Sequence, residues 1–186
     1  KFNDLAKAVN DNLDNFELGV AVSKLYDFIW DVYCDWYIEL TKPRIMAGGE
    51  TMASAQAVLV FIMQGILKLL HPFMPFITEE LWQNLSARQE GETIMFQSVP
   101  AGNNFSADLL EQFENAQQIV MNVRNIRQSK QISPKEALEI FAKAPYNASM
   151  DAIIKKLANI TNINVVDAFD ADAQGVNFMI KTSEFF

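Results

Sequence analysis

Residues 27–40 read DFIWDVYCDWYIEL and contain two overlapping helical patterns, one of acidic and one of aromatic residues. Carboxylates recur at every fourth position, and a spacing of four places them on one face of an α-helix. The acids are Asp27, Asp31, Asp35 and Glu39. The aromatic residues between them are Phe28, Trp30, Tyr33, Trp36 and Tyr37. The stretch therefore predicts a helix with one acidic edge, whose other faces are packed or bind a ligand.

An apolar line extends this helix in both directions. Its period is close to 3.6 residues, which predicts one helix from about residue 16 to 40 with these positions in the core. The line consists of Leu18, Val22, Leu25, Ile29, Val32, Trp36 and Leu40. Pro43 is predicted to end the helix, because proline disfavours a helical residue before it. Gly48 and Gly49 predict the turn that follows.

Other patterns along the chain define the fold class. Helical periodicity occurs over residues 2–15, from Thr51 or Ser54 to about 70, in a short segment capped by Thr78, and over 106–128 after Ser106. Residues 87–105 are loop-like, with an extended piece at 93–96. A turn at Ser133 precedes a strand-like alternation over 137–143, a helix at 147–158 and strands at 163–166 and 176–180. The predicted fold class is mainly α: a helical bundle over 1–128, followed by a small α/β subdomain over 129–186.

Composition excludes several classes of protein. Half of the 186 residues are apolar and 20% are charged, which is typical of a folded globular chain. A net charge of −8 argues against nonspecific nucleic-acid binding, whose affinity comes from many contacts to phosphate. No apolar run approaches the ~20 residues of a membrane span, so we expect no membrane partner. The single Cys34 fits a reducing, cytoplasmic location. The chain begins with Lys1 rather than methionine, so we expect it to belong to a longer protein.

Catalytic and metal-binding groups are sparse. His71 is the only histidine and lies at a helix end beside Pro72, where packing or capping explains it. One histidine and one cysteine make a zinc site improbable, and a di-iron bundle site would need Glu-x-x-His pairs that the sequence lacks. We therefore expect no catalytic residue, no metal and no cofactor in this chain.

The inner acids of the stripe, Asp31 and Asp35, have no lysine or arginine one helical turn away. Asp35 adjoins Trp36 and is predicted to be enclosed, and a buried carboxylate needs a partner. Arg124 and Arg127 are the predicted partners in a structural salt bridge with Asp35. The outer acids are expected to face water.

Two interpretations of the aromatic residues stay open. Tyr26, Trp30, Tyr33 and Tyr37 form a second line about 100° from the apolar line. Rings at these positions either pack against another helix or present stacking surfaces for unpaired bases. Residues 120–143 are locally basic, which suits either a solvated helix face or one bound polyanion.

Three segments resemble a known family. They are YDFIWDVYCDWYIELTKPRI at 26–45, KLLHPFMPFITEELWQ at 68–83 and VRNIRQSKQISPKEALEIFAKA at 123–144. Together they are similar to the anticodon-binding domain of class I aminoacyl-tRNA synthetases of the valine, isoleucine and leucine group. The combination CDWYIEL…KPR with LLHPFMPFITEELW most resembles the valyl-tRNA synthetase form, and an isoleucyl-type synthetase is the nearest alternative.

The resemblance implies a function for the chain and for its residues. A complete synthetase of this group uses ATP and Mg²⁺ and carries HIGH and KMSKS signatures, and neither string occurs here. The chain is thus expected to be a non-catalytic fragment that helps its parent, a valine–tRNA ligase, to select tRNA(Val). Its partners would be the tRNA(Val) anticodon stem-loop and the remaining domains of the synthetase. The implied RNA-binding residues are Lys42, Arg44, Trp30, Tyr33, Tyr37, Arg124, Arg127 and Lys130.

Two other hypotheses compete with the tRNA-binding module. One is a helical protein-interaction domain of the same fold without direct RNA contact. The other is a small metal-dependent or acid–base enzyme built on the acidic stripe. Arg124 and Arg127 cannot fully serve both Asp35 and RNA phosphate, so their assignment stays open at the level of sequence.

Overall fold

The computed structural model describes residues 1–98, 100, 106–169 and 175–186, and the chain divides into two compact units, Lys1–Asn104 and Phe105–Phe186. The predicted class, mainly α with helices followed by a small α/β part, is confirmed. The predicted domain boundary at 128 falls within helix α6 (Ala107–Lys130), which belongs to the second unit.

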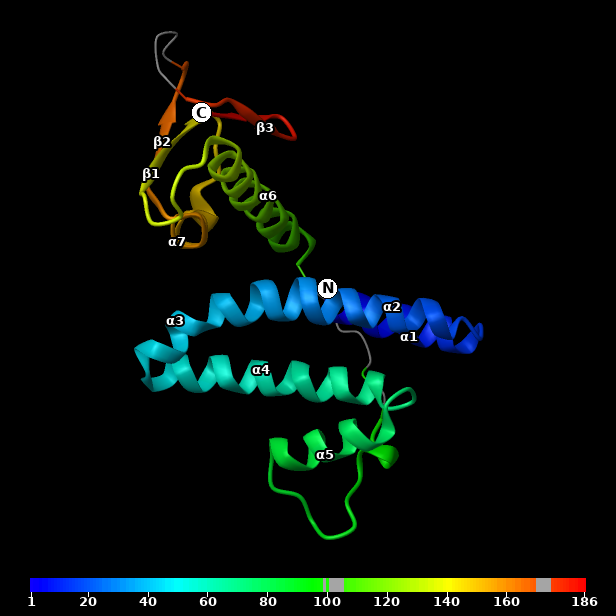
Figure 1. Cartoon of the computed structure of the whole chain (residues 1–186). Coiled ribbons are helices and arrows are strands. Elements are labelled where there is room, and N and C mark those ends of the chain that lie inside the picture. The colour runs from blue at the N-terminus through cyan, green and yellow to red at the C-terminus, as the bar shows by residue number, and fades with distance from the viewer. Residues whose placement is uncertain (99, 101–105, 170–174) are drawn as a thin grey trace. The chain divides into compact units, whose positions relative to one another are not determined.

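The first unit consists of helices. They are α1 (Phe2–Asp14), α2 (Leu18–Asp27), the π-helix η1 (Phe28–Ile38), α3 (Glu39–Ala47), α4 (Gly49–Leu70), α5 (Pro75–Leu85) and the 3₁₀ turn η2 (Ile94–Phe96). Helix α4 runs back antiparallel to the continuous α2–η1–α3 helix, and α5 packs on α4 (Figure 1). The core joins α1, α2, η1 and α4 through Val9, Leu25, Phe28, Tyr33 and Ile66. Residues 93–96, predicted to be extended, contain η2 instead.

The π-helix changes which residues face the core. Its backbone hydrogen bonds span five residues instead of four, so the 3.6-residue repeat breaks at Phe28. Buried positions follow Ala21, Leu25 and Phe28 at helical spacing, and the next buried residue is Tyr33, five positions later. The predicted core line is therefore partly wrong. Leu18 and Val22 are exposed, and its members from position 29 onward are only partly buried.

Two predicted helix boundaries are also wrong. Pro43 lies inside α3, which continues to Ala47 and ends at Gly48, where φ is +73°. The buried Thr41 hydroxyl donates to Ile38 O (2.8 Å) on the turn before this proline, which adds a side-chain donor where proline brings no N–H. Thr78 does not cap α5: the helix begins at Pro75, a favoured first position, and the Thr78 hydroxyl donates to Met74 O at 2.8 Å.

The second unit packs two helices with a small sheet. Helix α6 is capped by Ser106, as predicted, whose Oγ accepts from Leu109 N. The other elements are β1 (Leu138–Lys143), the 3₁₀ turn η3 (Ala148–Met150), α7 (Asp151–Ala158), β2 (Ile160–Val166), β3 (Phe178–Ile180) and β4 (Ser183–Phe185). The sheet order is β2-β1-β4-β3, with β1 and β2 parallel and the other pairs antiparallel. Helix α7 thus forms the crossover between the two parallel strands.

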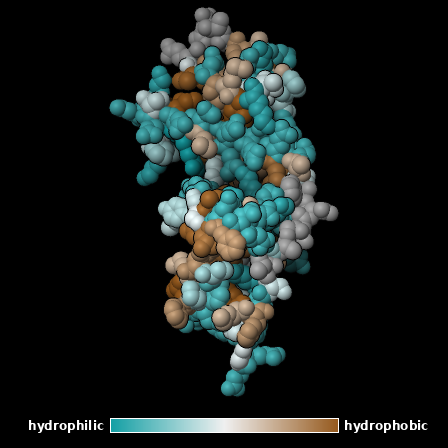
Figure 2. All heavy atoms as spheres, turned by 90° about the vertical axis from the view of Figure 1, so that its right-hand side faces the viewer, coloured by the Kyte–Doolittle hydropathy of each residue, from teal (hydrophilic) through white to brown (hydrophobic). Residues whose placement is uncertain are grey.

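The surface of the helical unit mixes apolar with hydrophilic side chains (Figure 2). One apolar stripe runs along α2 and η1 at intervals of four and comprises Leu18, Val22, Tyr26 and Trp30, all exposed. Among the described helices, α4 alone is long and apolar enough to cross a membrane, by length and composition only. Core helices of water-soluble proteins meet the same criterion, and Ile66 and Leu69 of α4 belong to the core of this unit.

Candidate nucleic-acid interface

The three rings predicted to contact RNA lie in different environments. Trp30 is 55% exposed, and its ring lies 6.2 Å from that of Tyr26, which is 62% exposed. Tyr33 is buried and donates from its hydroxyl to Leu59 O on α4 at 3.0 Å. Tyr37 is half-buried and stacks on Tyr33 at 6.3 Å. Among the three, only Trp30 is exposed enough to stack on a base. Tyr26, which was not among the predicted RNA-binding residues, is exposed beside it. The spacing of four residues between Tyr26 and Trp30 could have indicated this pair from the sequence.

Lys42 and Arg44 are exposed near the C-terminal end of α3, before the turn at Gly48. Lys42 pairs with Glu39 one turn earlier, and the Arg44 guanidinium donates to Ser54 Oγ at 3.4 Å. Burial raises the pKa of Tyr37, and the positive charge of Arg44 acts against this shift. Both cations share one continuous helix with Trp30, which lies twelve residues before Lys42.

The acidic stripe is a solvated edge of the same helix. All four of its members are exposed, including Asp35, which was predicted to be enclosed. An exposed carboxylate needs no buried partner, so the reason for assigning Asp35 a structural salt bridge disappears. Among the described residues, no group of three or more His, Cys, Asp or Glu side chains is placed to hold a metal ion.

Arg127 has a different role from both that were predicted for it. Its side chain is 5% exposed, and its guanidinium donates to four backbone carbonyls within the second unit. These acceptors are Ser133 O and Glu136 O for Nη1, at 3.0 and 2.8 Å, and Ala158 O and Asn159 O for Nη2, at 3.1 and 3.0 Å. All four N–H groups of Nη1 and Nη2 are used, so neither Asp35 nor RNA phosphate can engage them.

The other two cations of this segment are exposed. Arg124 donates from Nη2 to Leu157 O at 3.2 Å, and Lys130 lies in the last turn of α6. The predicted basic cluster is therefore divided between one buried structural arginine and two surface cations. For Arg124 and Lys130 the predicted contact to phosphate stays a prediction.

Comparison with known protein families gives a match over most of the chain. Residues 1–142 match the family described as the anticodon-binding domain of tRNA ligase. The chain belongs to this family. The matched residues include the whole first unit, together with helix α6 and most of strand β1 of the second unit.

Relatives of this anticodon-binding domain are valine–tRNA ligases. The enzyme of Parabacteroides distasonis is 38% identical over 177 residues, which are 95% of this chain and 20% of that protein. That of Porphyromonas gingivalis is 35% identical over 186 residues, covering 100% and 21%. That of Gloeobacter violaceus is 41% identical over 149 residues, covering 80% and 16%. The chain thus spans about a fifth of the length of the curated relatives it matches.

The second segment that resembles the family, HPFMPFITEELW at 71–82, has a structural role in the anticodon-binding domain. His71 Nδ1 lies 2.7 Å from Thr78 Oγ1, and the Thr78 hydroxyl donates to the backbone, so the imidazole is the donor of this pair. Trp82 is almost completely buried, and the Arg88 guanidinium lies 3.5 Å above its ring. The first contact joins the end of α4 to α5, and the second covers Trp82 near the C-terminal end of α5.

Glu79 fastens the following loop to α5. Its carboxylate accepts from Thr93 Oγ1 (2.6 Å), Gln83 Nε2 (2.7 Å) and Ile94 N (3.2 Å). Partial burial raises the pKa of Glu79, but these hydrogen bonds and the nearby His71 outweigh burial and lower the pKa below its ordinary value. The ionised form is therefore the one that the fold stabilises.

Glu79→Gln is expected to destabilise the helical unit by on the order of 1 kcal/mol at pH 7. Because the folded pKa is lowered, the contribution of Glu79 is complete above its unfolded pKa and is lost as pH falls through the folded pKa. The difference between wild type and variant should therefore shrink between pH 7 and pH ~3, measured by urea unfolding. Glu80→Gln, next to it and exposed, is the matched control. Equal costs of Glu79→Gln at both pH values would contradict the charge-based role.

Proposed function

We propose that this anticodon-binding domain contacts the anticodon stem-loop of tRNA(Val) and serves a valine–tRNA ligase as its tRNA-selecting part. The observation that carries the proposal is the exposure of Trp30, Lys42 and Arg44 on one helix of a chain in this family. Specific RNA recognition mostly targets unpaired loops, whose bases stack on rings while cations hold the backbone. These three side chains supply both kinds of contact.

The acidic balance of the domain is compatible with this role. The first unit carries 7 Lys and Arg against 13 Asp and Glu, a difference of −6, yet Lys42 and Arg44 lie together at one corner. Sequence information is read by a few base contacts, whereas nonspecific affinity grows with the number of phosphate contacts. An acidic surface with one cationic corner thus favours a defined site over indiscriminate RNA binding.

The parent enzyme would supply the chemistry. ATP and Mg²⁺ belong to its catalytic part, and this chain carries neither the HIGH nor the KMSKS string. The proposed role of the chain is recognition without catalysis, in the cytoplasm, next to the remaining domains of the synthetase.

Replacing Lys42 and Arg44 together with alanine is expected to weaken binding of tRNA(Val) without unfolding the domain. If each cation contacts one phosphate, the slope of log K against log salt should fall by about 1.4. The measurement is titration with tRNA(Val) and with an anticodon-swapped variant, at several salt concentrations. Lys7→Ala is the control, since Lys7 is also exposed and ion-paired on its own helix. Equal affinity for the two tRNAs at low salt, or unchanged affinity in the double variant, would contradict the proposal.

The exposed apolar stripe on α2 and η1 favours a second function, docking of a protein surface. Glu17, Asp27 and Asp31 lie beside it, so the complementary surface would be apolar with basic flanks. Substitutions at Leu18 and Val22 would then impair assembly with the rest of the ligase and leave tRNA binding by the isolated chain unchanged.

A further inference from the structure

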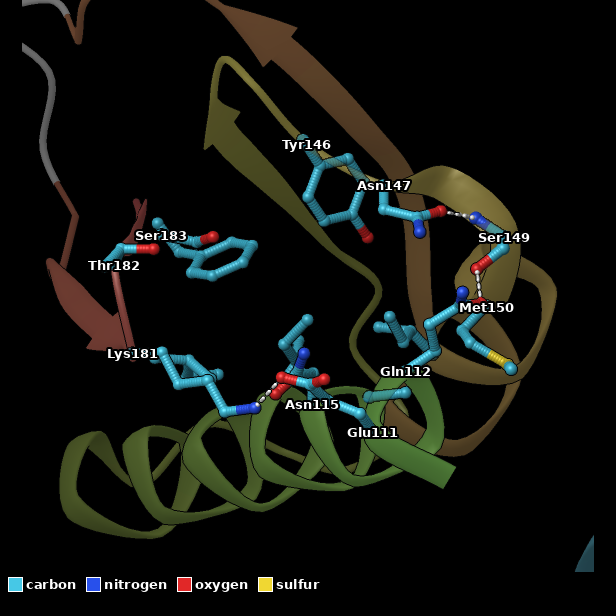
Figure 3. A pocket seen from close by; sticks show the side chains of 15 residues that line it. Glu111, Gln112, Asn115, Tyr146, Asn147, Ser149, Met150, Lys181, Thr182 and Ser183 are labelled. Atoms are coloured by element: carbon cyan, nitrogen blue, oxygen red, sulfur yellow. Dashed lines mark hydrogen bonds and ion pairs between the residues drawn. The ribbon is translucent and has the colours of Figure 1, made fainter. Parts of the chain in front are cut away.

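A pocket that the proposed function leaves unused lies in the second unit, among α6, the segment before α7 and the β3–β4 hairpin (Figure 3). Its volume is about 230 Å³. Sites for drug-sized ligands usually enclose about 300–1,000 Å³, so this pocket suits a single ring system. The floor is apolar and buried and consists of Ala116, Ile119, Ile154, Ile180 and Phe185.

Two aromatic rings border the pocket. Tyr146 and Phe185 meet edge to face, with ring centroids 5.9 Å apart and an interplanar angle of 88°. The Tyr146 hydroxyl donates to Asp151 Oδ1 at 2.7 Å, which holds its ring in place. Burial, followed by this hydrogen bond, raises the pKa of Tyr146, so the hydroxyl stays neutral. A flat ligand would therefore meet an uncharged aromatic wall.

The charges at the rim are already neutralised. Lys181 Nζ contacts Glu111 Oε1 at 2.6 Å across the mouth of the pocket (Figure 3). The hydrogen bond and the charge of Lys181 lower the pKa of Glu111, so this carboxylate stays ionised and paired. A pocket with balanced charges offers little to a phosphate or a free carboxylate, and it favours an uncharged polar ligand.

One acceptor next to the pocket is unsatisfied. Asn115 lines the pocket, and its buried Oδ1 has no hydrogen-bond partner among the described residues. Leaving a buried acceptor unpaired costs free energy, which a ligand N–H would recover. The neighbouring polar groups are oriented: Ser149 Oγ donates to Gln112 Oε1 at 2.8 Å, and Ser149 N donates to Asn147 Oδ1 at 2.9 Å.

We propose that this pocket binds a nucleobase, with the ring over the apolar floor beside Tyr146 and Phe185 and an N–H of its edge donating to Asn115 Oδ1 once the amide turns toward the ligand. A nucleobase is planar, uncharged and rich in N–H donors, and asparagine side chains pair with base edges. The base comes from one of two sources, an unpaired nucleotide of RNA or a free nucleoside. The RNA source rests on the proposed function, whereas binding of a free nucleoside does not.

The test is ¹H–¹⁵N NMR of the full chain during separate titrations with adenosine, guanosine, cytidine and uridine. At least one nucleoside should give saturable shift changes confined to pocket amides such as those of Ser149, Thr182 and Ser183. Asn115→Leu should weaken this binding at least tenfold while the thermal midpoint stays or rises, because an unsatisfied acceptor is replaced by an apolar group. Asn122→Leu, the same change elsewhere on α6, should bind as wild type does.

The experiment answers two questions separately: whether the pocket binds a base, and whether that base belongs to RNA or to a free nucleoside. The same pocket shifts with single-stranded RNA homopolymers identify an RNA base, and shifts with nucleosides alone identify a free nucleoside. The pair of substitutions at Lys42 and Arg44 should leave nucleoside binding unchanged, so a failure of the tRNA proposal is distinguishable. Absence of a saturable response to every nucleoside and RNA, or undiminished binding by Asn115→Leu, overturns the proposal.

Discussion

Replacing Arg127 with methionine is expected to destabilise the second unit, Phe105–Phe186, strongly, while the stability of the helical unit is unchanged. Methionine keeps most of the apolar stem of arginine but leaves four backbone carbonyls without their donors. Breaking a buried charged network of this kind costs about 3–5 kcal/mol. A domain of this size is stable by roughly 4–12 kcal/mol, so the loss removes a large part of its stability.

The location of the acceptors explains why this one side chain matters. Ala158 O and Asn159 O lie at the C-terminal end of α7, where helix carbonyls lack intrahelical partners and a cation is favourable. Ser133 O and Glu136 O belong to the turn that leads from α6 to β1. Arg127 therefore ties together α6, this turn and the end of α7, three segments that pack around the sheet.

Spectroscopy can follow the two units separately, because all three tryptophans lie in the first unit. In Arg127→Met, tryptophan fluorescence should report a normal urea transition, while amide protection in β1 and β2 should fall by several hundredfold, as about 3–5 kcal/mol of lost stability implies. Arg127→Lys, which keeps the charge but not the planar fork, should have an intermediate effect. Arg124→Met, on the exposed part of the same helix, should cost less than about 1 kcal/mol. Full protection of the strands in Arg127→Met would disprove the structural role.

The order of elements follows from local patterns, and these are visible in a single sequence. Helical periodicity predicted α1, α4 and α6, the Ser106 cap was recognised from its residue type, and alternation predicted β1. The π-helix was not predictable in this way, because a 3.6-residue template fits the same residues with a different face inward. The fourth strand, β4, was missed because only one of its three residues, Phe185, is apolar, so it shows neither alternation nor an apolar run.

Candidate site residues were harder to place than elements. Lys42 and Arg44, predicted to bind RNA, are exposed near a helix end, where a charged side chain seldom has a reason to be buried. The sequence could not identify Arg127 as structural, because its four acceptors are backbone carbonyls up to 32 residues away and carry no residue-type signal. The exposure of Asp35 was likewise not predictable, because it depends on the π-helix. In the π-helix Tyr33 faces the core, and Asp35, two residues later, faces solvent.

Tyr33→Ala is expected to destabilise the helical unit by about 3–5 kcal/mol, in the range of aromatic truncations in a packed core. Tyr33 is the buried residue five positions after Phe28, and its hydroxyl connects η1 to α4 through Leu59 O at 3.0 Å. Tyr33→Phe removes only that hydrogen bond and should cost about 1 kcal/mol. Urea unfolding followed by circular dichroism measures both changes.

Trp30→Ala separates the packing role of the aromatic helix from its proposed role in RNA binding. Trp30 lies three residues before Tyr33 but is exposed, so its removal should change stability by less than about 0.5 kcal/mol. Loss of one stacking platform should weaken tRNA binding by about 1–3 kcal/mol while leaving the salt dependence unchanged, since no phosphate contact is removed. Tyr33→Phe should bind tRNA as wild type does. The opposite result, with stability dependent on Trp30 and RNA affinity on the Tyr33 hydroxyl, would mean that the α-helical repeat, and not the π-helix, determines which ring faces solvent.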